Sequence, residues 1–199
     1  NTALGDSSLS ANTTASNNVA VGASALVANT TGADNVAVGR NSLDANTTAN
    51  YNTAVGSIAL SANTTGASNT ALGYASLNLN TTASNNTGVG YAALNANTTG
   101  TNNNSVGMNS MVINTTGSNN VAFGVGALYS NTTANDNTAV GHNTLLLNTT
   151  GTRNTSVGSL ALAAATTADN NTAVGYDALG DVTTGANNTA MGDRAGDKL

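Results

Sequence analysis

The segment Asn18-Val19-Ala20-Val21-Gly22 returns along the whole chain at one fixed spacing. A period near twenty residues is typical of solenoids, in which each repeat forms one coil and stacks on the next. The repeat therefore predicts one elongated domain over residues 1–199. The glycine that ends the segment recurs every seventeen residues, at Gly5, Gly22, Gly39, Gly56, Gly73, Gly90, Gly107, Gly124, Gly141, Gly158, Gly175 and Gly192.

Two apolar columns accompany the glycine. Leucine stands four residues after it in ten coils, and Met111 replaces it once. We interpret this column as the side chains that point into the coil. The residue before the glycine is mostly Val and forms a second apolar column, and the residue two before it is always small, which lets another layer approach closely. The predicted structural ladder thus includes Gly22, Gly39, Gly56, Leu26, Leu43 and Leu60.

The secondary structure predicted for each coil is entirely β. Thr53-Ala54-Val55 and its copies alternate and carry β-branched side chains, which favours strands of three to five residues. A second short strand is predicted through segments such as 57–60. A coil of seventeen residues has no room for a useful helix, so we expect an all-β fold, a parallel β-solenoid or β-roll with twelve 17-residue coils. Stacked about 4.8 Å apart, twelve coils give a rod of roughly 55 Å.

Asn-Thr-Thr is the second signature of the repeat. Asn and Gly tolerate left-handed backbone conformations, so this segment is interpreted as the turn of the coil. Asn29, Asn46 and Asn63 complete the predicted structural ladder, because stacked coils place each Asn above the last and allow amide-to-amide hydrogen bonds along the rod. A second such column runs from Asn18 to Asn188, just before each predicted strand.

The same Asn-Thr-Thr triplets satisfy the N-glycosylation sequon. We favour the interpretation that Asn and Thr suit the turn, and the alternative is a row of glycans along one edge of the rod. The candidate glycosylation sites are Asn12, Asn29, Asn46, Asn63, Asn80, Asn97, Asn114, Asn131 and Asn148.

Residues 165–199 depart from the repeat. Ala165 and Val182 replace the turn Asn, and charges gather in this part of the chain. At one-coil spacing Asp177 is predicted to meet Arg194, and Asp181 to meet Lys198. These coils are therefore predicted to be a cap or a junction, whereas the open β edge at the other end invites pairing with another chain. The chain also starts in mid-repeat, so we expect a processed product or an excerpt of a longer protein.

Composition argues against several function classes. The net charge is −5 and there is no basic face, which argues against nucleic-acid binding on electrostatic grounds. The chain has no Cys and one His, so zinc-ligand spacing cannot be met, and we expect no metal and no cofactor. No apolar run reaches transmembrane length. Gly88-Val89-Gly90 and Gly124-Val125-Gly126 look like fragments of a phosphate-binding loop but are interpreted as products of the repeat. We therefore expect no catalysis.

One variable column, directly after the repeated glycine, is predicted to be exposed. It contains Arg40, Ser57 and Ser159 among other residues. We interpret its His as a surface residue rather than a catalytic base, since no second His or Cys accompanies it. The candidate surface contacts in this column are Tyr74, Tyr91, His142 and Tyr176.

Two adjacent threonine columns, beginning at Thr13 and Thr14, raise an alternative function. Stacked Thr on a flat solenoid face is a way of binding ice. Adjacent residues of a strand point to opposite faces, so only one of the two columns can lie on such a face. We therefore favour a structural role for the Thr ladder and keep an ice-binding, or antifreeze, β-solenoid as the alternative.

A family resemblance joins these observations. Asn52-Thr53-Ala54-Val55-Gly56 and Asn171-Thr172-Ala173-Val174-Gly175, each followed by a small residue and Leu, resemble the head repeat of YadA-like trimeric autotransporter adhesins and related repeats of phage tail fibres. The resemblance covers every coil and implies a left-handed parallel β-roll that trimerises and binds host matrix or surfaces. The present coil is longer, with the Asn-Thr-Thr turn as the addition.

The predicted function is an extracellular structural or adhesive fibre segment, at a cell surface or in a virion tail fibre. We expect it to associate with itself, as a homotrimer through the small-residue face or end to end as a filament. Repeated weak contacts would then add through effective concentration. A host or environmental surface or a glycan is the predicted external partner.

Overall fold

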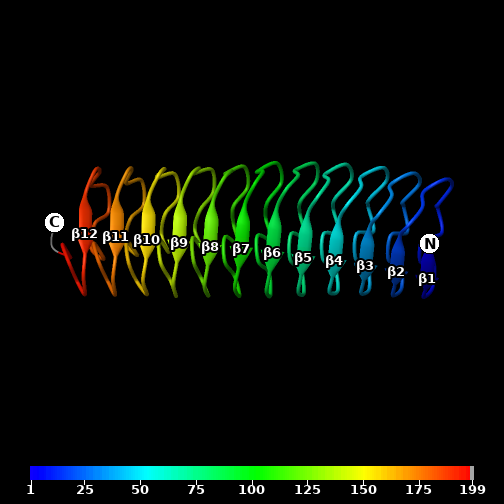
Figure 1. Ribbon diagram of the computed structural model, residues 1–199, viewed down its shortest axis with the longest axis horizontal. Helices are drawn as coiled ribbons and strands as arrows, with labels where there is room; N and C mark the ends of the chain where they lie inside the picture. The colour runs from blue at the N-terminus through cyan, green and yellow to red at the C-terminus, as the bar shows by residue number, and fades with distance from the viewer. Residues whose placement is uncertain (198–199) are drawn as a thin grey trace.

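The computed structural model describes residues 1–197 and is a rod built on one parallel sheet (Figure 1). Strands β1 to β12 follow one another in chain order across the sheet, and each residue pairs with the residue seventeen positions away, as Ala20 pairs with Ala3 and Ala37. The predicted parallel β-solenoid with a seventeen-residue coil is confirmed. The strands are Thr2–Leu4, Val19–Val21, Val36–Val38, Thr53–Val55, Thr70–Leu72, Thr87–Val89, Asn104–Val106, Val121–Phe123, Thr138–Val140, Thr155–Val157, Thr172–Val174 and Thr189–Met191.

Each three-residue strand turns its middle residue inward and the two flanking residues outward. Ala20, Ala37 and Ala54 are fully buried, whereas the residues on either side of them are partly exposed. The small column therefore lines the interior, where it leaves room for the leucine side chains. From β2 to β12 the small middle residues are buried, so they are not available for the contacts between copies expected of a small-residue face, and trimerisation itself stays a prediction.

The leucine column forms the core as predicted. Leu26, Leu43 and Leu60 are completely buried, and Met111 occupies the same position in its coil. Alanines from the strand and from the turn before each leucine complete a single apolar cluster that runs along the rod. Because every leucine packs on the coil above and the coil below, the core is continuous from coil to coil.

The second predicted strand is absent from the described coils, and a tight turn takes its place. In the segment 57–60, Ile58 and Leu60 have φ angles of 52° and 53°, which belong to the left-handed region and not to a strand. The left-handed conformation costs a leucine about 1–2 kcal/mol. Full burial of its side chain returns about 1.5–3 kcal/mol, and the turn also keeps hydrogen bonds to its neighbours, since Leu60 N donates to Ser76 O at 3.0 Å.

The repeated glycine is required where strand and turn meet. Gly22 has a φ of 128°, and a Cβ placed there would lie 2.7 Å from the carbonyl carbon of Gly39 in the next coil. Both the conformation and the close approach of backbones exclude a side chain. The predicted structural role of Gly22, Gly39 and Gly56 is confirmed by this stacking.

Candidate functional site

The turn asparagines form a buried amide ladder. Asn46 Nδ2 donates to Asn29 Oδ1 at 2.8 Å and to Ala49 O at 3.1 Å within its own turn. The same amide-to-amide bond recurs at Asn63, where the distance is 3.2 Å, and continues as far as Asn148. The amide ladder predicted for this column is confirmed.

Burial of this ladder bears on the candidate glycosylation sites. From Asn29 to Asn148 these side chains are buried, and Asn12 is half-buried. The nitrogen that would carry a glycan is the nitrogen that donates to the neighbouring coil. Glycosylation stays a prediction. A glycan on this nitrogen would take the place of a hydrogen bond of the ladder, so a glycosylated Asn could not keep its position in the folded turn.

The second asparagine column also runs along the interior. Asn35 N donates to Asn18 Oδ1 at 2.9 Å, and Asn35 Nδ2 donates to Ala49 O at 2.9 Å. This column begins at Asn1 and continues to Asn188. Each coil whose turn carries an asparagine, from Asn12 to Asn148, therefore uses two asparagines to join its turn and strand to the neighbouring coils.

The outward residues of the strands make up a long surface that we call the sheet face. It consists of the first and third residues of β1 to β12, because the middle residues point inward. The third-position side chains are aliphatic, aromatic or Met, and several are strongly exposed. Leu4 is 68% exposed, Phe123 57% and Met191 77%. The sheet face carries no charged side chain, since its first positions hold only Thr, Val or Asn.

The predicted surface contacts lie on the outside of the rod but do not form one cluster. Tyr74 and Tyr91, on adjacent coils, stack with ring centroids 5.4 Å apart and planes 15° apart. His142 is exposed on a more distant coil, and Tyr176 lies under the Arg194 guanidinium at 5.9 Å. The structure thus brings together the first two tyrosines only.

The two threonine columns differ in their hydrogen bonding. Thr30 Oγ1 donates to Thr47 O at 3.0 Å, and this bond repeats from coil to coil. The adjacent Thr31 column is exposed. Both columns lie in bends rather than strands, so the first column stitches successive turns together and the second faces solvent.

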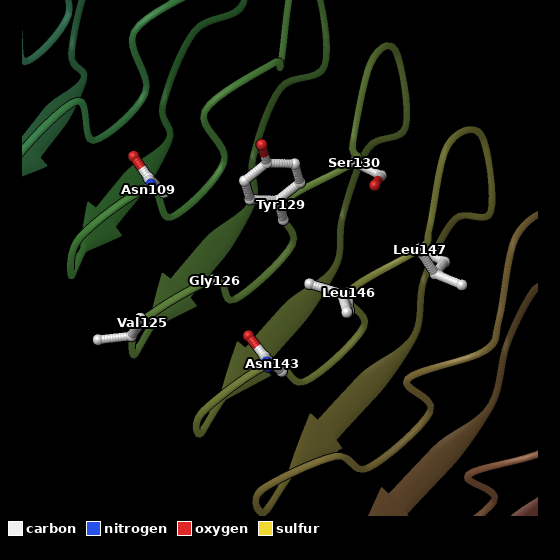
Figure 2. A pocket seen from close by; sticks show the side chains of 8 residues that line it. All are labelled: Asn109, Val125, Gly126, Tyr129, Ser130, Asn143, Leu146 and Leu147. Atoms are coloured by element: carbon white, nitrogen blue, oxygen red, sulfur yellow. The ribbon is translucent and has the colours of Figure 1, made fainter.

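A notch that sequence reasoning missed lies at the turn after β8 (Figure 2). Its volume is about 350 Å³, and Gly126 stands at its floor between Asn109 of the preceding coil and Asn143 of the following coil. Tyr129 and Leu146 lie beside it, with Val125, Ser130 and Leu147 completing the lining. The signal was Gly126 itself, the one glycine in a column that otherwise carries side chains.

Charged groups are few and mostly near the C-terminal end. Arg194 Nε lies 3.9 Å from Asp177 Oδ2, which confirms that predicted pair, whereas Lys198, the predicted partner of Asp181, lies outside the described residues. Hydrogen bonds from Thr152 N and Oγ1 hold the pKa of Asp169 below its ordinary value of 3.8. Within residues 1–197, no three acidic, His or Cys groups are placed to share a metal ion.

The described part of the chain contains no helix able to span a membrane. Comparisons of the chain with protein-family models, with curated proteins and with solved structures found no match.

Proposed function

We propose that the protein is a structural or adhesive fibre segment, extracellular or on a cell or virion surface, that associates with copies of itself through the sheet face. The observation that carries the proposal is the apolar third-position column, which is partly or fully exposed in every coil from Leu4 to Met191. A contiguous exposed apolar surface of this kind is uncommon on monomeric proteins and marks interaction sites.

The charge distribution supports self-association. The chain has a net charge of −5, so copies repel one another through most of their surfaces. The sheet face is free of charge, which lets identical faces approach without placing like charges in contact. Burying its Val, Leu, Phe and Met side chains gives about 25 cal/mol for each Å² removed from water.

The regular register supports a parallel arrangement. In a cyclic assembly whose axis follows the rod, each copy presents the same residue at the same level. Phe123 would then meet Phe123 of the other copies, and Leu72 would meet Leu72. Twelve levels of weak contact add into one stable association, and the turns on the opposite side of the coil stay free for an external partner.

Charge insertion on the sheet face tests the proposal. Val55→Lys combined with Val106→Lys places a cation in two levels of the face and is expected to reduce the sedimenting mass to that of one chain. The matched control is Thr65→Lys with Thr116→Lys, which adds the same charges on the exposed threonine column of the same coils. A monomeric unmodified protein at all concentrations, or dissociation by both pairs alike, would refute association through this face.

A second candidate function is ice binding by the same face. The observation that favours it is the first-position column, where eight of the twelve strands begin with Thr and parallel pairing keeps these positions in register. Such a column presents regularly spaced hydroxyls and methyl groups to water. Thermal hysteresis measured on monodisperse monomer decides between the two functions: activity there supports ice binding, and its absence in a trimeric protein supports the fibre.

A further inference from the structure

We infer that the notch over Gly126 is a binding site for a neutral saccharide unit. The notch lies in the turn after β8 and not on the sheet face, so it remains open when copies associate there. The inference does not rest on self-association. It rests on three features of the notch, which are its missing side chain, its unpartnered polar groups and its lack of charge.

The missing side chain at Gly126 creates the space. Gly126 has a φ of 66°, close to the 56° of Asn109 and the 52° of Asn143 in the neighbouring coils. Asn109 and Asn143 adopt this left-handed conformation, so the backbone conformation at position 126 does not require glycine. A Cβ at Gly126 would lie 2.3 Å from Asn143 Oδ1, so the Asn143 amide occupies part of the space that a side chain would take and forms one wall of the notch.

Polar groups around the notch lack partners within the described chain. The side-chain amides of Asn109 and Asn143 are partly exposed and make no hydrogen bond to residues 1–197, although each offers both a donor and an acceptor. In the two asparagine ladders, by contrast, the side-chain amides donate hydrogen bonds to neighbouring groups of the chain. The two free amides stand on either side of Gly126, about one coil away from it in each direction (Figure 2).

Two coils of the described chain, unlike the others, carry a side-chain hydrogen bond whose counterpart is absent at the notch. In two earlier coils an Asn donates to the backbone of the coil before it: Asn78 Nδ2 to Ile58 O at 2.9 Å, and Asn95 Nδ2 to Ala75 O at 2.8 Å. The equivalent residue above Asn109 O is Tyr129, which has no amide to donate. A hydroxyl of a bound molecule can supply that hydrogen bond.

The lining determines the class of ligand. Leu146, Leu147 and Val125 provide apolar surface, Tyr129 provides an aromatic ring with a polar tip, and none of the lining residues is charged. A pocket of about 350 Å³ lies at the small end of ligand sites. A neutral sugar ring combines an apolar face for the Leu and Val side chains with hydroxyls for the Asn109 and Asn143 amides.

Amide chemical-shift mapping tests the site with defined probes. The methyl glycosides of glucose, galactose and N-acetylglucosamine are titrated separately into the protein, and cyclohexanol serves as an apolar ring without the additional hydroxyls. We expect at least one glycoside to shift the amides of Asn109, Gly126 and Asn143, with weak affinity in the millimolar range. Shifts from cyclohexanol alone, or from none of the glycosides, would overturn the inference.

Variants localise the binding. Gly126→Asn fills the notch with the residue found at the same position in both neighbouring coils and is expected to abolish the shifts. Ala75→Asn adds the same side chain in the same column of a distant coil and should leave them unchanged. Asn143→Ala removes one amide without filling the notch and should weaken binding about fivefold. Full binding by Gly126→Asn would contradict the site. These outcomes are independent of self-association, which is measured by sedimentation.

Discussion

The two asparagine columns use the same side chain in the same solenoid but end differently. The column before the strands runs from Asn1 to Asn188, where the end coil is partly exposed. The turn column stops at Asn148, because Ala165 takes the next position, and Asn148 Oδ1 is left buried without a hydrogen bond. Asn12 Oδ1, at the first turn, is likewise buried without a hydrogen bond, so both ends of the turn column leave a buried oxygen unpaired at a cost in stability, whereas the other column ends in a partly exposed coil.

The largest effect is expected from breaking the column before the strands. Asn103→Ala removes the acceptor of the Asn120 backbone N–H, which lies in a buried position. A buried backbone N–H without a partner is rare and costly, so we expect a loss of about 2–4 kcal/mol with the cavity included. Urea denaturation followed by circular dichroism measures it. An unchanged midpoint would show that the column is dispensable.

A break in the turn column should cost somewhat less. Asn97→Ala leaves Asn80 Oδ1 without its donor, while Asn114 Nδ2 keeps its second bond to Gly117 O. One orphaned side-chain oxygen in the core costs about 1–3 kcal/mol. Thr99→Ala, on the exposed column of the same coil, is the control and should change the unfolding midpoint little. Equal effects of the two variants on the unfolding midpoint would show that the turn ladder does not stabilise the fold.

Repairing the natural break should stabilise the C-terminal coils. Asn at position 165 can donate to Asn148 Oδ1, and Asn at position 182 can in turn donate to the new oxygen. We therefore expect the pair Ala165→Asn and Val182→Asn to raise stability by about 0.5–1.5 kcal/mol, and Ala165→Asn alone to gain less. Slower hydrogen exchange in residues 150–180 measures the gain. Faster exchange in the paired variant would mean that the ladder ends at Asn148 for a packing reason.

The smallest effect concerns the two hydrogen bonds that Asp169 accepts from Thr152 N and Oγ1. The folded pKa of Asp169 lies below its ordinary value, so its contribution to stability is complete above pH 3.8 and is lost as the pH falls through the folded pKa. Asp169→Asn keeps an acceptor, as Asn50 and Asn135 do at the same position of other coils. The stability difference between the two proteins should shrink on acidification. A stability difference that grows towards low pH would show that ionised Asp169 does not stabilise the fold.

Much of the fold could be read from the sequence because every coil repeats it. The spacing of Gly22 and its copies predicted the register, the leucines predicted the core, and the stacked asparagines predicted the ladders. Each of these features follows from placing like residues above one another. In a repeat protein the period itself shows which distant residues are in contact, whereas the sequence of a globular domain without repeats does not.

The failures arise where tertiary stacking overrides local preference. Leucine avoids the left-handed region on its own, so nothing in the segment 57–60 indicates that Leu60 adopts it. The direction of the small column was misjudged because a three-residue strand must turn either Ala or its Val neighbours inward, and only the packing of the leucines decides which. The notch depends on a side chain that is absent at Gly126, a signal that becomes visible only beside Asn109 and Asn143.

Cross-linking of single-cysteine variants tests the association through the sheet face most directly, because the chain has no natural Cys. Val106→Cys places a thiol on the sheet face, and Thr116→Cys places one on the exposed turn of the same coil. Under mild oxidation, parallel association through the sheet face predicts covalent dimers from Val106→Cys and almost none from Thr116→Cys. Equal cross-linking of the two variants, or none in either, would contradict the proposal.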